Sequence, residues 1–180
     1  MPDDVLVLPV QREELPIVVE MGRQTFIDNY AHLNDPDNFQ NYINEAFAPD
    51  QWYLEWLDPH ARFFIAWLND EPVGYIKVNL HRGKKGLEGD QHTELERIYV
   101  VAAAQKSGIG RQLLAKAIEM AKSTASEYLW LGVWQDNPKA IEWYKRQGFE
   151  QFGEHTFKLG IEDQKDWLMR LKVAGHKTHS

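Results

Sequence analysis

The turn at residues 105–110 constrains the fold more than any other part of the chain, because it places two glycines between two clearly patterned stretches. Residues 93–101 before it have the composition of a strand, and residues 108–122 after it carry apolar side chains along one helical face. Glycine allows backbone conformations and close approaches that larger residues block. The N–H groups of residues 106–111 can therefore converge on an anion at the helix N-terminus. Taken alone, the pattern is also typical of a tight strand-to-helix turn without a ligand.

The alternation of strand and helix patterns along the chain predicts an α/β fold. Besides residues 93–101, apolar runs predict strands at residues 5–10, 63–68, 72–80, 128–134, 149–157 and 166–173. Helical spacing predicts helices at residues 13–30, 35–47, 50–57, 108–122 and 137–147. Helices that alternate with central strands imply a mixed sheet of about seven strands, covered on both faces. We expect one domain over residues 1–174 and a short flexible tail over residues 175–180.

Composition excludes several classes of function. The 180 residues include no cysteine, which rules out disulfides, thiolate metal sites and a cysteine nucleophile. The seven histidines show no metal-binding spacing, so no metal is expected, and we expect them at the surface or in loops. A net charge of −7 disfavours nucleic acid as a partner and favours a cation, although many soluble proteins are acidic for solubility alone. Without an apolar run of about 20 residues or a secretory signal, the expected location is the cytoplasm, with no membrane contact.

The order of motifs after residue 93 resembles the GCN5-related N-acetyltransferase (GNAT) family. Its parts are Glu-Leu-Glu-Arg-Ile-Tyr-Val at 94–100, Gln-x-x-Gly-x-Gly at 105–110, Asn-x-x-Ala at 137–140, Tyr144, and Gly-Phe at 148–149. Within the family the chain is most similar to bacterial PaiA-type spermidine/spermine acetyltransferases, through Thr25, Phe26, Tyr30 and residues 74–79, 96–99 and 130–134. The resemblance implies the GNAT fold, with the sheet splayed between its fourth and fifth strands. It also implies transfer of an acetyl group from acetyl-coenzyme A to an amine.

The same resemblance implies where acetyl-coenzyme A binds. The backbone of Ile98, Tyr99 and Val100 would pair with the pantetheine arm like an added strand, and the Asn137 side chain would hold the same arm. The diphosphate would bind the N–H groups of the turn, which include those of Gln105, Lys106, Gly108, Ile109, Gly110 and Arg111. Many relatives begin this turn with arginine where this chain has Gln105. Lys106 is then the nearest source of the missing positive charge.

Two chemical roles remain for side chains beside the thioester. The resemblance implies that Tyr144 is the general acid that protonates the departing thiolate, although its helical spacing alone is typical of a core residue. A primary amine with a pKa near 10.4 is neutral in only about one molecule in 2,500 at pH 7, an obstacle of roughly 4.6 kcal/mol, so a base is expected. Glu94 and Glu96 alternate onto one face of their strand beside the expected gap, and either can be this base. The alternative for both is ion pairing within the sheet.

The acceptor is expected to bind against the first helices and the fifth strand. Phe26, Tyr30 and Trp134 are the candidate contacts, because aromatic faces attract cations. Acidic residues are frequent between residues 28 and 58, which suits an elongated polyamine such as spermidine or spermine but is also typical of solvated helix faces. Other amines remain open, such as a protein N-terminus, an amino acid or an antibiotic, and so does a non-catalytic sensor of acetyl-coenzyme A. A homodimer is expected, because relatives are often dimers and the late strands offer edges for pairing.

Overall fold

The computed structural model describes residues 4–30, 35–159 and 161–173, and the predicted tail lies outside these ranges. A seven-stranded mixed sheet runs in the order β1-β2-β3-β4-β5-β7-β6. The strands are β1 (Val5–Pro9), β2 (Ala61–Leu68), β3 (Glu71–Asn79), β4 (His92–Val100), β5 (Tyr128–Trp134), β6 (Glu150–Leu159) and β7 (Glu162–Lys172). The expected α/β fold with a mixed sheet of about seven strands is confirmed. In the described ranges, no helix is both long and apolar enough to cross a membrane.

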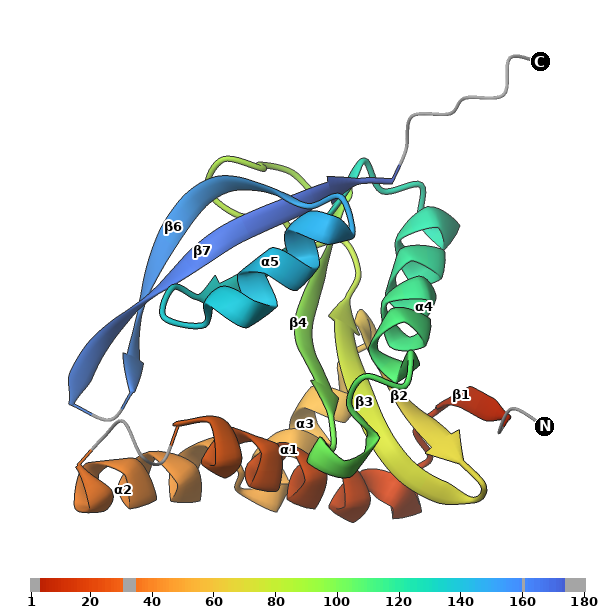
Figure 1. Cartoon of the computed structure of the whole chain (residues 1–180). Coiled ribbons are helices and arrows are strands. Elements are labelled where there is room, and N and C mark those ends of the chain that lie inside the picture. Colours follow the sequence, from red (N-terminus) through yellow and green to blue (C-terminus); the bar gives the residue numbers. More distant parts are fainter. Residues whose placement is uncertain (1–3, 31–34, 160, 174–180) are drawn as a thin grey trace.

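Helices cover both faces of this sheet (Figure 1). They are η1 (Arg12–Glu14), α1 (Leu15–Tyr30), α2 (Pro36–Ala46), α3 (Pro49–Leu57), η3 (Ala102–Ala104), α4 (Ile109–Ser123) and α5 (Pro138–Arg146). Leu113 of α4 and Ile141 of α5 are buried in one cluster with strand residues. Trp52 of α3 is buried in a second cluster with Tyr75 of β3, on the opposite face. Each face of the sheet therefore has its own core.

The sheet opens between β4 and β5. Their parallel pairing runs from His92 with Tyr128 only as far as Glu94 with Trp130. Beyond that point, residues 95–100 remain against β3 but have no partner strand on the β5 side. β5 itself pairs along its full length with β7. This confirms the predicted splay between the fourth and fifth strands, which leaves main-chain groups of β4 facing a gap.

Three details of the fold differ from the sequence-based expectation. The last strand begins at Glu162 rather than at residue 166, and it lies between β5 and β6. The first helix begins as a 3-10 turn and becomes α-helical at Leu15. The expectation that the histidines lie at the surface or in loops is wrong for His92, which is 4% exposed. His92 is the first residue of β4 and pairs with Tyr128, so the sheet itself covers it.

Candidate active site

The turn between β4 and α4 has the shape of an anion-binding site. Lys106 and Gly108 have φ values of 68° and 86°, in the left-handed region, and Gly108 precedes α4 without a capping side chain. Within the described ranges, the N–H groups of residues 106–111 have no protein acceptor. Unpaired donors around a helix N-terminus form a concave surface that a phosphate group can satisfy.

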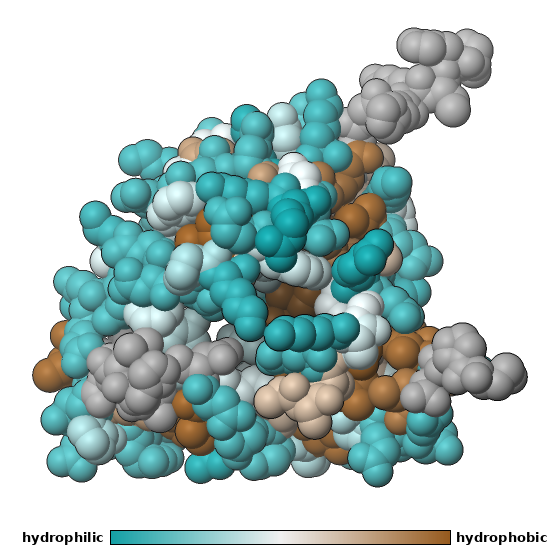
Figure 2. Space-filling model, viewed as in Figure 1, coloured by the Kyte–Doolittle hydropathy of each residue, from teal (hydrophilic) through white to brown (hydrophobic). Residues whose placement is uncertain are grey.

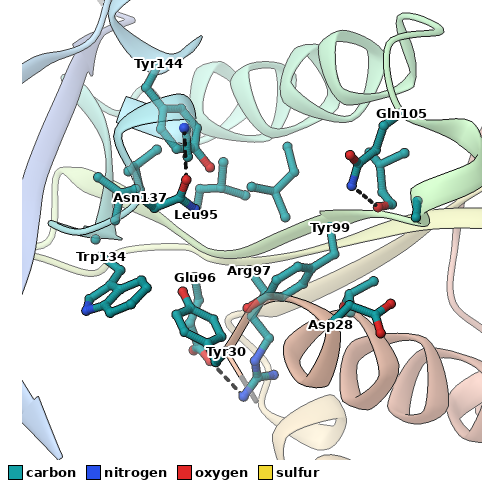
Figure 3. A pocket seen from close by; sticks show the side chains of 18 residues that line it. Asp28, Tyr30, Leu95, Glu96, Arg97, Tyr99, Gln105, Trp134, Asn137 and Tyr144 are labelled. Carbon is teal, nitrogen blue, oxygen red and sulfur yellow. Dashed lines mark hydrogen bonds and ion pairs between the residues drawn. The ribbon is translucent and has the colours of Figure 1, made fainter. Parts of the chain in front are cut away.

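Gln105 plays a different part from the residues that follow it. Its N–H group donates to the carbonyl of Ala102 at 3.3 Å, so it is not one of the unpaired donors. Its side-chain Nε2 donates to the carbonyl of Val100 at 3.1 Å (Figure 3). Val100 belongs, with Ile98 and Tyr99, to the stretch of β4 that lacks a partner on the β5 side. An extended chain can add to this free edge, and Gln105 covers one of its acceptors.

Tyr144 and Asn137 lie on the α5 side of β4, opposite Tyr30 (Figure 3). Asn137 caps α5, because its Oδ1 accepts from the N–H of Ala140 at 3.2 Å, and its amide nitrogen is left for a ligand. Tyr144 is 8% exposed, and its hydroxyl has no hydrogen-bond partner among the described residues. Burial, with a smaller contribution from Tyr99, raises the pKa of Tyr144. The hydroxyl therefore stays protonated at neutral pH and can donate to a ligand.

Two cavities meet in the gap between the strands. The first, of about 340 Å³, runs along β4 and past Asn137 and Tyr144. The second, of about 380 Å³, lies toward α1 and α2 and reaches β6 and β7. Both cavities are lined by Tyr30, Glu96, Arg97, Tyr99, Gly132 and Trp134. The surface on this side is visibly hollowed, with apolar atoms in the depth of the hollow (Figure 2). Two ligands, one in each cavity, can therefore touch.

Comparison with known proteins assigns the chain to a protein family. The acetyltransferase (GNAT) family model matches residues 27–149. The chain belongs to this family. An uncharacterized N-acetyltransferase encoded in the pepI 3′ region of Lactobacillus delbrueckii subsp. lactis is 30% identical over 94% of this chain and 98% of its own length. Membership confirms the predicted N-acetyltransferase class, with acetyl-coenzyme A as the cosubstrate.

Two solved structures share the GNAT fold with this chain. The PaiA N-acetyltransferase of Thermoplasma acidophilum in complex with coenzyme A has a TM-score of 0.74 at 18% identity, over 94% of this chain and 99% of that one. A spermidine N-acetyltransferase SpeG chimera from Vibrio cholerae and hSSAT has a TM-score of 0.68 at 17% identity, over 94% of this chain and 95% of that one. At these identities the likeness establishes the fold alone.

The acceptor side of this GNAT site contains a network of ion pairs. The Lys77 ammonium contacts carboxylate oxygens of Glu55 at 2.6 Å and Glu96 at 2.8 Å. The Arg97 guanidinium contacts the same two residues at 2.9 and 3.0 Å, and it lies 4.2 Å from the ring centroid of Trp52. Burial opposes ionisation of Glu96, but the charges of Arg97 and Lys77 outweigh it and hold its pKa below the usual range. Glu96 is therefore ionised and held on both oxygens.

Glu94 differs from Glu96 although both face the same cavity, as their alternation predicted. Its Oε1 accepts from Asn79 at 2.8 Å and lies 3.4 Å from Arg82. Its other oxygen has no protein partner among the described residues. Burial, together with the charge of Glu96, raises the pKa of Glu94. The two glutamates thus offer different chemistry, because only Glu94 keeps a free carboxylate oxygen.

The three predicted acceptor contacts come together around the second cavity. Tyr30 lies 4.9 Å from Trp134 and 4.5 Å from Phe26, measured between ring centroids. All three line that cavity, and Tyr30 and Trp134 also line the first. Phe26 is only 9% exposed and stacks on Tyr42, so it mainly supports the side chains that line the cavity. An aromatic wall of this kind suits a cationic or apolar acceptor.

Sequence reasoning missed several charged residues of this GNAT site. Lys77 lay in a strand that was considered only for resemblance, and Glu55 was counted among acidic residues of the first helices. Asp166 on β7 lines the second cavity and was not considered. A polar residue inside an apolar strand, such as Lys77 or Asn79 in β3, was the available signal. Among the described residues, no group of three or more histidine, aspartate or glutamate side chains could hold a metal ion.

Proposed function

We propose that this GNAT protein transfers acetyl from acetyl-coenzyme A to a primary amine, and that the acceptor is a small polyamine of the spermidine and spermine class. The meeting of the two cavities at Glu96, Gly132 and Trp134 carries the proposal. One cavity passes the unpaired β4 edge and Tyr144, and the other holds carboxylates and aromatic rings. This arrangement supports direct attack in a ternary complex. An acyl-cysteine intermediate is excluded, because the chain has no cysteine.

In the proposed reaction the amine nitrogen bonds to the carbonyl carbon of the thioester, and the carbon–sulfur bond breaks. The N–H groups of residues 106–111 would hold the diphosphate, while the backbone of residues 98–100 and the Asn137 amide would hold the pantetheine arm. Tyr144 would give a proton to the departing sulfur, as its protonated and unpaired hydroxyl allows. Holding both reactants in one gap removes most of the entropic cost of their encounter.

The base in this reaction needs a carboxylate oxygen that is free to take a proton. Both oxygens of Glu96 accept from Lys77 or Arg97, and its lowered pKa makes it a weak base. Glu94 has a raised pKa and one free oxygen. Of the two predicted glutamates, Glu94 therefore suits the role better.

The polyamine acceptor is supported by the chemistry of the second cavity. Tyr30, Tyr42 and Trp134 present aromatic faces, which attract ammonium groups by about 0.5–2 kcal/mol each. Among the described residues, Asp166 and the second oxygen of Glu94 have no protein cation beside them, whereas Glu94 Oε1 lies 3.4 Å from Arg82. Two structural neighbours, a PaiA enzyme and a spermidine N-acetyltransferase SpeG chimera, are consistent with this choice.

One observation favours a different acceptor. Lys77 and Arg97 neutralise Glu55 and Glu96, so the acidic character expected from the sequence is partly cancelled inside the cavity. A mostly neutral cavity suits an amine with a single positive charge, such as an amino acid, a protein N-terminus or an antibiotic amine. The acetyl-transfer chemistry would be the same.

An acceptor panel tests the proposal. We expect acetyl-coenzyme A consumption, measured as released thiol, to be fastest with spermidine or spermine. The panel adds a simple monoamine of equal chain length, amino acids, an N-terminal peptide and an aminoglycoside. Clear turnover of one of these, without turnover of either polyamine, would remove the polyamine proposal. Binding of acetyl-coenzyme A without transfer to any amine would instead support the sensor alternative.

Three further proposals rest on the sequence. A cytoplasmic location, one domain over residues 1–174 and a homodimer all remain predictions. For the homodimer, β6 is an edge strand of the sheet, as the expectation of pairing through the late strands requires. Light scattering on the purified chain measures its mass, and a monomeric mass at micromolar concentration would contradict the homodimer.

A further inference from the structure

Asp166 lines the second cavity and lies against Gly132, which lines both cavities. It lies on β7 and pairs in register with Trp134 of β5. Its carboxylate turns toward the main chain of Gly132, because a Cβ atom built on Gly132 would lie only 2.9 Å from Oδ2 of Asp166. Gly132 lines both cavities. The missing side chain at Gly132 thus leaves the room that the Asp166 carboxylate fills.

The Asp166 carboxylate differs from the other acidic groups of the cavity in having no partner. Glu96, like Glu55 beside it, is held by Lys77 and Arg97, and Glu94 is held by Asn79 and Arg82. Within the described part of the chain, no hydrogen bond or ion pair reaches the Asp166 side chain. Folding gains nothing from an ionised carboxylate left unpaired in a half-buried position, because its desolvation is uncompensated. A ligand that pairs with this carboxylate would supply the compensation.

Asp166 shares the second cavity with aromatic side chains of α1, α2, β4 and β5. Burial raises the pKa values of Tyr30, Tyr42 and Tyr99, and the negative charge of Asp166 adds a smaller contribution to each. Burial in turn raises the pKa of Asp166 to about 6, and Lys84 opposes this only in part. A carboxylate with aromatic faces around it is an environment that an ammonium group fits.

We propose that Asp166 binds the ammonium group of the acceptor where the two cavities meet and accepts its proton before attack. The proposal rests on the function proposed above and adds the residue that prepares the amine. The ammonium gives one proton to the carboxylate and becomes a neutral amine. Its lone pair then forms the carbon–nitrogen bond while the carbon–sulfur bond breaks. Tyr144 gives its proton to the departing sulfur, and the second proton lost from the nitrogen restores the Tyr144 hydroxyl. Asp166 later loses its proton to water.

Position makes Asp166 better suited to this step than Glu94. Both carboxylates line the second cavity, but Gly132, against which Asp166 lies, also lines the first cavity, where the thioester would bind. Glu94 lines only the second cavity and is tied to Asn79. Glu94 can then hold a more distant ammonium of a polyamine. Asp166 holds the ammonium that reacts.

The first test compares Asp166→Asn with Asp163→Asn. Asp163 is on the same strand but is exposed and paired with Lys158, so its variant is a matched control. With the best amine of the acceptor panel, we expect kcat/KM to fall about 10²–10⁴-fold for Asp166→Asn and to be unchanged for Asp163→Asn. The Kd of acetyl-coenzyme A, measured by calorimetry, should be unchanged in both.

The pH profile separates proton transfer from positioning. We expect kcat of the native enzyme to fall as the pH drops through about 6, and the Asp166→Asn variant to lack this limb. Other ionisable groups face the same cavity: Lys84 and His155 from the loop and β6, and Glu94, Glu96 and Arg97 from β4. Burial and Lys84 lower the pKa of His155, so it can add a limb of its own. The comparison with the variant isolates the limb that belongs to Asp166.

The Asp166→Asn substitution should lower activity but raise the stability of the folded protein. In the folded protein the pKa of Asp166 is about 6, above its ordinary value of 3.8, so the folded state binds this proton more tightly than the unfolded state. Stability therefore falls as the pH rises from about 4 to about 6, and an amide at this position removes the loss. We expect a higher melting temperature for Asp166→Asn at pH 7.5, and no difference for Asp163→Asn.

Each outcome bears on the proposal. Undiminished turnover by Asp166→Asn would overturn the proposal. So would a pH profile of this variant in which kcat still falls as the pH drops through about 6. A variant that is less stable or fails to fold at neutral pH would overturn it too, because that result gives Asp166 a structural role. Failure of the native enzyme to acetylate any amine would instead sink the proposed function, and the panel reveals this before any variant is made.

Discussion

The two sides of the splayed sheet are built by different means. On the coenzyme side the recognising groups are mostly main-chain atoms of one continuous stretch, from the free edge of β4 through the turn at residues 105–110. On the acceptor side they are side chains from elements far apart in the chain, including α1, α3, β3, β4 and β7. A main-chain site requires conformations, which glycine spacing reveals in the sequence. A side-chain site requires a topology, which no local pattern reveals.

The coenzyme side does contain one side chain with a chemical role, and its removal should have the largest effect. Tyr144→Phe deletes the only hydroxyl that we assign to the departing sulfur. We expect kcat to fall about 10²–10⁴-fold, because a general acid typically contributes that much. The Kd of acetyl-coenzyme A should change less than twofold, since the loop amides and the β4 edge remain. Steady-state kinetics at saturating amine and calorimetry measure the two quantities.

Tyr128→Phe is a matched control for this variant. Tyr128 is also on an element that borders the gap, but it lines neither cavity. Its loss should leave kcat unchanged. Equal rates for Tyr144→Phe and the native enzyme would mean that water protonates the thiolate. The contrast between the coenzyme side and the acceptor side would then become sharper, because the coenzyme side would depend on main-chain groups alone.

The acceptor side should be more sensitive in its stability. Lys77→Met leaves Glu55 and Glu96 with only Arg97 to offset their charges. We expect the free energy of unfolding to fall by about 3 kcal/mol at pH 7, since an uncompensated charge remains in a part-buried site. Burial opposes ionisation of both glutamates, yet Arg97 and Lys77 hold their pKa values low. Stability from such groups is present above the ordinary glutamate pKa and is lost in acid.

Denaturant unfolding at several pH values measures this effect. The difference in unfolding free energy between the native protein and Lys77→Met should shrink in acid, as the pH falls below the ordinary glutamate pKa and then through the lowered pKa values of the folded protein. Lys158→Met is the control, because Lys158 pairs with Asp163 at 3.1 Å while both side chains are exposed. Its cost should stay below about 1 kcal/mol. If Lys77→Met lowers the free energy of unfolding by no more than Lys158→Met does, the ion pairs around Lys77 do not stabilise the fold. The contrast between the coenzyme side and the acceptor side would then weaken.

The same contrast explains what the sequence could predict. The turn follows from local rules and the free edge of β4 was implied by the family resemblance, and the structure has both where they were expected. The insertion of β7 between β5 and β6 does not follow from local rules, because the register of a late strand depends on which edge remains free. Asp166 was missed for that reason. Only this insertion brings it against Gly132.

The ambiguity between Glu94 and Glu96 has a similar origin. Alternation places both on one face of β4, and the sequence could go no further. The partners that separate them are Lys77 and Asn79 of β3 and Arg97 of β4, and they lie beside an irregularity in the β3–β4 register near Lys77. Such a register shift leaves no reliable mark on a single sequence. Their difference in pKa therefore arises from tertiary structure.

The smallest predicted effect tests the coenzyme side through its backbone. Gly108→Ala places a side chain at a φ of 86°, where it finds open space but an unfavourable conformation. We expect the free energy of unfolding to fall by about 1–2 kcal/mol. If the turn relaxes to avoid this strain, the N–H groups of residues 106–111 no longer converge, and the Kd of coenzyme A should rise about tenfold, which is about 1.4 kcal/mol. Thermal unfolding and calorimetry provide both values.

Gly89→Ala separates strain from recognition, because Gly89 has a φ of 98° and equally open space but lies in the loop between β3 and β4. It should cost the same stability and leave the affinity for coenzyme A unchanged. Gly110→Ala completes the set, since its new Cβ would lie 3.5 Å from Trp143, an ordinary contact, without a positive φ. An affinity loss there without a stability loss would mean that the ligand approaches this residue closely. If Gly108→Ala loses stability like Gly89→Ala but keeps its affinity, the left-handed turn does not organise the donors, and the distinction between a main-chain side and a side-chain side no longer holds.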